Sequence, residues 1–257
     1  MPPPAGPLMS RVVWGVNPVL ELLRSQPERV EEIWLAASGL KGKRRRILDL
    51  ARNLEVPVKV VREFHPPKVP SGAPTQGVVA YLREFDYLSW PEFEEELSSV
   101  PDPVVLLLDE LTDPQNVGSL IRSAEVLGAR GVVIPKHRAA GITPTVIKAS
   151  AGAVFHLPIV RVVNLRQALR RLKELGFTLY GLDAAGPREI METDLTGPVG
   201  LVVGSEGRGL RESVRRECDL LVRIPVQGRI ESLNAAVAGA IALYETLRQR
   251  LCTASTV

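Results

Sequence analysis

Residues 104–128 have the sequence VVLLLDELTDPQNVGSLIRSAEVLG. The five apolar residues at its start predict a strand that is buried on both faces, and residues 117–127 predict a helix that Gly128 ends. Asp113 or Asn116 can cap this helix, because both side chains accept hydrogen bonds from free backbone N–H groups. The polar residues between strand and helix lie at the carboxyl end of a strand, which is where open α/β sheets bind ligands.

The same alternation of strand and helix continues over the rest of the chain. We expect further strands at 131–134, 178–182, 199–203 and 221–224, and helices at 143–149, 165–175, 210–217 and 233–250. Apolar strands that alternate with helices are typical of a mostly parallel sheet with helices on both faces. The sequence therefore predicts the α/β class for this part of the chain.

The preceding region reads as a smaller α/β unit. We expect Asn17 to cap a helix that has Pro18 at its first position. Short strands are expected at 33–35, 56–61 and 77–81, and a basic amphipathic helix at 42–53. The composition then changes, since four glutamates lie between Glu92 and Glu96 in a candidate for a short polar helix, which two prolines end. We therefore predict four parts: a Pro- and Gly-rich lead-in (1–10), an N-terminal domain (11–82), an acidic linker (83–101) and a C-terminal domain (102–252).

The composition excludes several classes of protein. The 257 residues are 45% hydrophobic and 24% charged, which is ordinary for a globular protein, and no apolar run is long enough to span a membrane. The N-terminus does not resemble a signal peptide. With two cysteines and three histidines we expect neither a disulfide framework nor a metal site, and we predict a cytoplasmic protein.

The charge is distributed unevenly. The formal net charge is +3, but residues 1–80 carry +5, residues 81–101 carry −5 and the remainder carries +3. Five of the cations lie in one short run: Lys41, Lys43, Arg44, Arg45 and Arg46. A run of this kind is either the solvated face of a helix or a surface that binds RNA phosphates, and both interpretations stand at this point.

A second polar segment follows the strand predicted at 199–203. Residues 202–210 have the sequence VVGSEGRGL. A glycine-rich turn after a strand allows a ligand to approach the backbone closely. The spacing matches neither the dinucleotide-binding motif nor a Walker loop. The segment alone is equally consistent with an ordinary loop and with a ligand site.

A third segment joins the last strand to the last helix. Residues 224–240 have the sequence IPVQGRIESLNAAVAGA, and the helix is expected to begin near Ser232. Its small residues permit close packing against another helix or a second subunit. In the simplest interpretation, Ser232 and Asn234 only cap a buried helix.

Together and in this order, the three segments resemble the motifs of the SpoU family of RNA ribose methyltransferases. The motifs are N-x-G-x-x-x-R, G-x-E-G-x-G and I-P-x-x-G-x-x-x-S-L-N, and the resemblance covers residues 102–250. Residues 14–19 (WGVNPV) and 75–80 (TQGVVA) resemble the ribosomal-protein-like, substrate-binding domain of the RlmB-like branch of that family. That branch often has histidine where this chain has Thr75.

The resemblance implies a trefoil knot in the C-terminal sheet, S-adenosylmethionine as the cofactor and a homodimer through the C-terminal domain, which the Ala/Gly-rich helix 235–242 suits. By the same resemblance, Gly204, Ile224 and Leu233 contact the cofactor through backbone groups. The positions that match the family's active-site and essential residues are Asn116, Arg122, Glu206, Ser232 and Asn234.

The implied reaction is methylation of a ribose 2′-hydroxyl, with a guanosine of 23S ribosomal RNA as the leading substrate. The alternatives are another 23S site, including one that confers antibiotic resistance, a tRNA, or an RNA-binding assembly factor without catalysis. We interpret Arg122 as a clamp on an RNA phosphate, because a guanidinium stays protonated and is a poor base. A nucleotide-binding dehydrogenase lacks support, since no strand–GxGxxG–helix unit is present.

Overall fold

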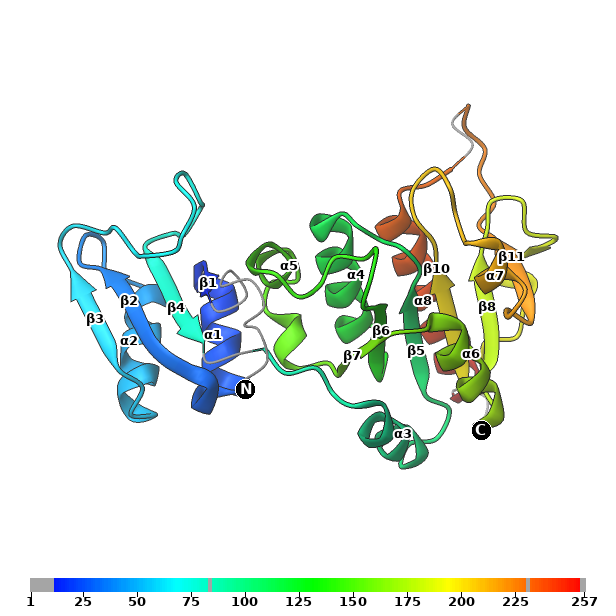
Figure 1. Ribbon diagram of the computed structural model, residues 1–257, viewed down its shortest axis with the longest axis horizontal. Coiled ribbons are helices and arrows are strands. Elements are labelled where there is room, and N and C mark those ends of the chain that lie inside the picture. The colour runs from blue at the N-terminus through cyan, green and yellow to red at the C-terminus, as the bar shows by residue number, and fades with distance from the viewer. Residues whose placement is uncertain (1–11, 83–84, 230–231, 255–257) are drawn as a thin grey trace, which may run out of the picture. The chain divides into compact units, whose positions relative to one another are not determined.

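The computed structural model describes residues 12–82, 85–229 and 232–254, so the predicted lead-in lies outside the described residues. The chain forms two compact units (Figure 1). The first unit contains the residues up to Asp86 together with Ile142–His156, and the second contains Tyr87–Gly141 and the residues from Leu157 onward.

The first unit is built on a four-stranded sheet. Its strand order is β1 (Val12–Trp14), β4 (Val78–Leu82), β2 (Val30–Ala36) and β3 (Val58–Val61), with β2 and β3 parallel and the other pairs antiparallel. The helices α1 (Val16–Ser25) and α2 (Lys43–Asn53) pack against each other and the sheet, and a short 3-10 helix, η2 (Pro27–Arg29), precedes β2. Because α1 begins at Val16 with Gly15 as its N-cap, the prediction that Asn17 caps it is wrong.

A segment from the second half of the chain belongs to the first unit. The helix α5 (Pro144–Ala149) packs on β1, and the 3-10 helix η3 (Ala153–Phe155) packs on α1. His156 Nε2 lies 3.1 Å from Glu21 Oε2, and Gln26 Nε2 donates to the Phe155 carbonyl at 3.1 Å. The helix was expected at 143–149, but a sequence pattern does not say which domain a helix packs against. The expected C-terminal domain is therefore interrupted.

The second unit contains a seven-stranded sheet in which every adjacent pair is parallel, which confirms the predicted mostly parallel sheet. The strand order is β7 (Ile159–Val162), β6 (Gly131–Pro135), β5 (Val104–Leu108), β10 (Val199–Val203), β8 (Thr178–Leu182), β11 (Leu220–Arg223) and β9 (Arg188–Glu189). The two outermost strands, β7 and β9, were not expected. The trefoil knot stays a prediction from the resemblance.

Helices cover both faces of this sheet. Val202 packs in a core with α6 (Leu165–Glu174) and α7 (Glu212–Arg215), whereas its neighbour Val203 faces Gly239 of α8 (Ala235–Ala254) (Figure 1). Successive residues of a strand point to opposite faces, so these helices lie on opposite sides. The helix α4 (Pro114–Val126) packs beside α8, where a Cβ added at Gly239 would lie 2.3 Å from Leu120. The small residues of α8 therefore serve close packing within the chain.

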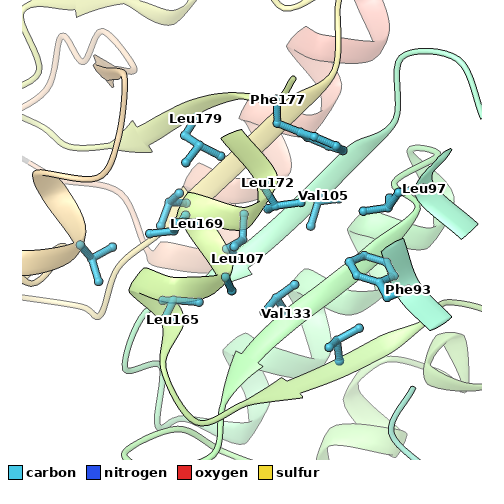
Figure 2. Packing of buried hydrophobic residues seen from close by; sticks show 14 of the residues in the cluster. Phe93, Leu97, Val105, Leu107, Val133, Leu165, Leu169, Leu172, Phe177 and Leu179 are labelled. Carbon is cyan, nitrogen blue, oxygen red and sulfur yellow. The ribbon is translucent and has the colours of Figure 1, made fainter. Parts of the chain in front are cut away.

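The acidic segment 83–101 differs from the linker that was expected. Its residues Trp90–Ser98 form helix α3, which a capping box of Ser89 and Glu92 begins. Phe93 and Leu97 are buried in the core of the second unit, and Figure 2 shows Val105 and Val133 between them and the leucines of α6. Because its apolar side chains are part of that core, the helix belongs to the second unit. The 3-10 helix η4 (Ile190–Glu192) completes the described elements.

Candidate active site

A pocket of about 680 Å³ opens at the carboxyl ends of β8, β10 and β11. This is the edge at which parallel sheets bind ligands. Its lining includes six residues predicted from the sequence: Gly204, Glu206, Ile224, Ser232, Leu233 and Asn234. The second and third motifs therefore meet at one place, together with the residues that follow β8.

Glu206 is the centre of a hydrogen-bonded cluster beside this pocket. Its Oε1 accepts a hydrogen bond from Asn116 Nδ2 at 3.0 Å and another from Asn234 Nδ2, and the backbone N–H of Ala235 approaches it at 3.4 Å. The Asn234 amide also donates to Asn116 Oδ1 at 3.0 Å. The side chain of Asn116 is buried, with 7% of its surface exposed. The cluster therefore joins the N-termini of α4 and α8 to the glycine-rich loop.

Asn234 also caps helix α8. Its Oδ1 accepts hydrogen bonds from the backbone N–H groups of Ala236 and Val237 at 2.9 and 3.1 Å. For Asn234 the capping interpretation is thus correct, but it is incomplete, since the amide nitrogen of the same side chain donates to Glu206 and Asn116. Asp113, rather than Asn116, caps α4, by accepting from the Gln115 N–H at 2.9 Å. This leaves the Asn116 side chain available for the cluster.

The glycines of the loop after β10 have a conformational role that the sequence did not show. A Cβ added at Gly204 would lie 2.2 Å from the backbone carbon of Gly209, because the loop turns back on itself. Gly207 and Gly209 have φ angles of +81° and +65°, which favour glycine. The close approach at Gly204 is therefore to the loop's own backbone, and the same backbone lines the pocket.

Arg122 lies outside the pocket. It is exposed on α4, six residues after Asn116, which places it about 120° around the helix from that residue. Its guanidinium forms no hydrogen bond or ion pair with any residue in the described ranges. The side chain is consequently available to an external anion.

Several residues that line the pocket were not expected from the sequence. Asp183, just after β8, lies 3.5 Å from Arg215 Nη1 in an ion pair, and Arg208 is exposed in the glycine-rich loop. Apolar walls come from Val203, Val222 and Val226. Most of these residues lie at or near the carboxyl ends of predicted strands, which is where a ligand site is expected. The local sequence pattern does not show, however, which strand ends are neighbours in the sheet.

The basic run lies on and just before α2 in the first unit, and most of its side chains have local partners. Lys43 Nζ donates to Asn17 Oδ1 at 3.1 Å, Arg44 donates to the Gly39 carbonyl, and Arg45 pairs with Asp49 at 3.1 Å. Lys41 and Arg46 are exposed, and no partner is found for either among the described residues. These two are the cations of the run that can reach a phosphate without breaking an existing contact.

Cys218 has no thiolate character that would suit nucleophilic catalysis. It packs beneath β8, close to Gly181, and burial raises the pKa of its thiol to about 12. In the described ranges we find no cluster of three or more acidic, histidine or cysteine side chains that could hold a metal ion. No helix among the described residues is both long and apolar enough to cross a membrane.

Comparison with known proteins covers nearly the whole chain. The model of the SpoU rRNA Methylase family matches residues 103–244, and the model described as RNA 2'-O ribose methyltransferase substrate binding matches residues 12–88. YacO of Bacillus subtilis (strain 168), assigned to the TrmH family of tRNA/rRNA methyltransferases, is 38% identical over 93% of this chain and 95% of its own length.

The 23S rRNA (guanosine-2'-O-)-methyltransferase RlmB of Escherichia coli (strain K12) is 34% identical over 94% of this chain and all of its own length. Among solved structures, the SpoU methyltransferase AviRb of Streptomyces viridochromogenes, in complex with AdoMet, superposes with a TM-score of 0.78. That match has 29% sequence identity and covers 94% of this chain and 90% of AviRb.

Proposed function

Because the chain belongs to the SpoU rRNA methylase family, we propose that it transfers the methyl group of S-adenosylmethionine to the ribose 2′-hydroxyl of a guanosine in 23S ribosomal RNA. The observation that carries this proposal is the cluster of Asn116, Glu206 and Asn234 beside the pocket. The full-length similarity to RlmB supports the choice of a 23S guanosine.

The pocket fits the cofactor in size and lining. Its volume of about 680 Å³ lies in the range of small-molecule sites, and it combines apolar walls with a glycine-rich backbone. Gly204, Ile224 and Leu233 would hold the adenine and ribose through backbone groups, since adenine has no charged handle. When bound, S-adenosylmethionine supplies an electrophilic methyl group on its sulfonium.

The protein residues orient the RNA hydroxyl for attack on that group. Arg122 would bind an RNA phosphate through its planar guanidinium, which suits two parallel hydrogen bonds and stabilises developing negative charge. Glu206 fixes Asn116, and through it the helix that bears Arg122, next to the pocket. Correct alignment of the reactants alone can supply a large part of the rate. The proton of the 2′-hydroxyl would pass to a nearby phosphate or to water, because a guanidinium stays protonated at neutral pH and is a poor base.

The first unit would bind the RNA. It matches the substrate-binding family model, and Lys41 and Arg46 are free to neutralise phosphates. The other three predicted RNA-binding cations, Lys43, Arg44 and Arg45, would contribute less, because their partners are already within the chain. Work on ribosomal RNA would place the protein in the cytoplasm.

A second copy of the chain would cover one face of α8. Val237, Ile241 and Tyr244 lie along this face and are 46%, 37% and 58% exposed, at the spacing of a helical stripe. Since the resemblance implies a homodimer, we expect Ile241→Glu with Tyr244→Glu to convert a dimer into a monomer in sedimentation analysis. A wild-type protein that sediments as a monomer would refute the dimer.

The direct test incubates the purified protein with labelled S-adenosylmethionine and either unmodified 23S RNA or tRNA, and then maps the 2′-O-methyl group. Methylation of one 23S guanosine is the expected result. Methylation of a tRNA, or of a different 23S nucleotide, would retain the chemistry and change the substrate. Cofactor binding without transfer to any RNA would instead favour the assembly factor.

A further inference from the structure

Asp109, the residue directly after β5, contacts both ends of the loop that carries Glu206. Its backbone N–H donates to the carbonyl of Val203, the last residue of β10, at 2.8 Å. Its carboxylate accepts the backbone N–H of Arg211 at 2.9 Å and the Arg211 guanidinium at 2.7 and 2.6 Å. Residues 204–210 lie between Val203 and Arg211. The backbone N–H of Asp109 therefore holds the start of this loop, and its carboxylate holds the end.

The loop between these two points is itself well defined. The backbones of Ser205 and Gly209 exchange hydrogen bonds of 3.1 and 2.9 Å, and Gly204 lies directly against Gly209. A loop tied at both ends and across its middle transmits the position of its ends to its tip. The tip is Glu206, whose Oε1 accepts from Asn116 and Asn234.

Burial makes this arrangement unusual for a purely structural contact. The side chain of Asp109 is fully buried, and that of Arg211 is 37% exposed. A buried ion pair can often be replaced by packed apolar side chains with no loss of stability. An apolar pair, however, cannot form directed hydrogen bonds. The Asp109 carboxylate accepts such bonds from one backbone N–H and one guanidinium, and these bonds fix the geometry of the loop.

We propose that Asp109 is a positioning residue for methyl transfer, which with Arg211 as its partner holds the 204–210 loop so that Glu206 meets Asn116 and Asn234. This proposal rests on the proposed function and assigns a role outside the three motifs. A displacement of about 1 Å at a reacting group can lower turnover by roughly 10²-fold, so a small shift of the loop has a measurable effect.

The first experiment compares turnover of the full-length protein with that of Arg211→Lys and Arg211→Ala. Arg211→Lys keeps the charge but loses the fork, and we expect it to lower kcat about tenfold, with Arg211→Ala lower still and the dissociation constant for RNA unchanged. Arg216→Ala is the matched control, since Arg216, directly after α7, pairs with Glu212 and both side chains are exposed. Wild-type kcat in both Arg211 variants overturns the proposal.

A double-mutant cycle separates positioning from general stability. If Asp109 acts through Glu206, then adding Asp109→Asn to Glu206→Ala should lower kcat by less than threefold, although Asp109→Asn alone lowers it about tenfold. Independent, multiplicative losses would contradict the proposal. If Asp109→Asn does not fold, Arg211→Lys replaces it in the cycle.

A third measurement does not depend on activity. Hydrogen exchange of the amides of residues 205–209 should be faster in Arg211→Ala than in the wild type, and unchanged in Arg216→Ala. Unchanged exchange in Arg211→Ala means that the contact does not order the loop, and the proposal fails. A wild-type protein that methylates no RNA would refute the proposed function, while this readout would still test the loop.

Discussion

The basic run of α2 and the cluster around Glu206 show opposite relations between sequence and space. Five cations lie within six consecutive positions in the run, but three of them already contact groups in their own unit. Glu206 lies 90 residues from Asn116 and 28 from Asn234, yet their side chains share hydrogen bonds. Residues that are adjacent in sequence thus have separate surroundings, while residues that are distant in sequence form one hydrogen-bonded group.

The difference has a physical origin. Neighbouring side chains on a helix point in directions about 100° apart, so a run of charges spreads around the axis and its members have different surroundings. The ends of adjacent parallel strands meet at one edge of the sheet, and polar residues after different strands are therefore brought together. We expect substitutions in the Glu206 cluster to affect each other, and substitutions in the run to act independently.

The largest effect is expected from Glu206→Ala. This substitution removes the carboxylate that accepts hydrogen bonds from the side-chain amides of Asn116 and Asn234. The cluster should therefore loosen. We expect single-turnover methyl transfer to slow by about 10²- to 10³-fold. Glu212→Ala, which removes an exposed carboxylate of α7, is the control. A loss of less than threefold would show that the three side chains do not form a functional group.

A smaller loss, of about 10²-fold in kcat/KM, is expected from Arg122→Lys. The ammonium retains the charge but cannot make two parallel hydrogen bonds to one phosphate. Arg130→Lys, at another exposed arginine of the second unit, should leave transfer unchanged. Near-wild-type turnover of Arg122→Lys would rule out the clamp.

The basic run can be divided experimentally into two pairs. Lys41→Ala with Arg46→Ala should weaken RNA binding. The negative slope of the logarithm of the RNA association constant against log salt should become less steep by about 2, since up to two phosphate contacts are lost. Lys43→Ala with Arg45→Ala is matched in charge but removes cations that already have partners, so we expect a smaller change. Equal changes in the two pairs would mean that the run acts as one surface, and that its members do not act independently.

The smallest effect on RNA binding is expected from Arg44→Ala. The Arg44 guanidinium contacts the Gly39 carbonyl and lies against Gly77, so its loss should lower Tm by a few degrees without changing affinity for RNA. Thermal unfolding and a filter-binding titration on the same preparation measure both quantities. A weaker affinity with unchanged Tm would reassign Arg44 to the RNA surface.

Most elements of the second unit could be predicted from the sequence, because their signals are local. The predicted strand 199–203 and the observed β10 have the same bounds, as do 178–182 and β8. The strands that were missed are short: β1 has three residues, β7 four and β9 two, which is too few to establish a period. The helix cap at Asn17 was misplaced because Gly15, with a φ of +100°, begins the helix instead.

For the site, the sequence by itself determined which residue types are present, the order of the three motifs and the strands and helices that carry them. Only the tertiary structure decided that Glu206 bonds to Asn116 and Asn234, that Asp109 holds both ends of the Glu206 loop, and that residues 142–156 pack with the first unit. Periodicity and capping depend on residues a few positions apart, whereas these contacts join residues that only the pairing order of the strands and the packing of the helices bring together.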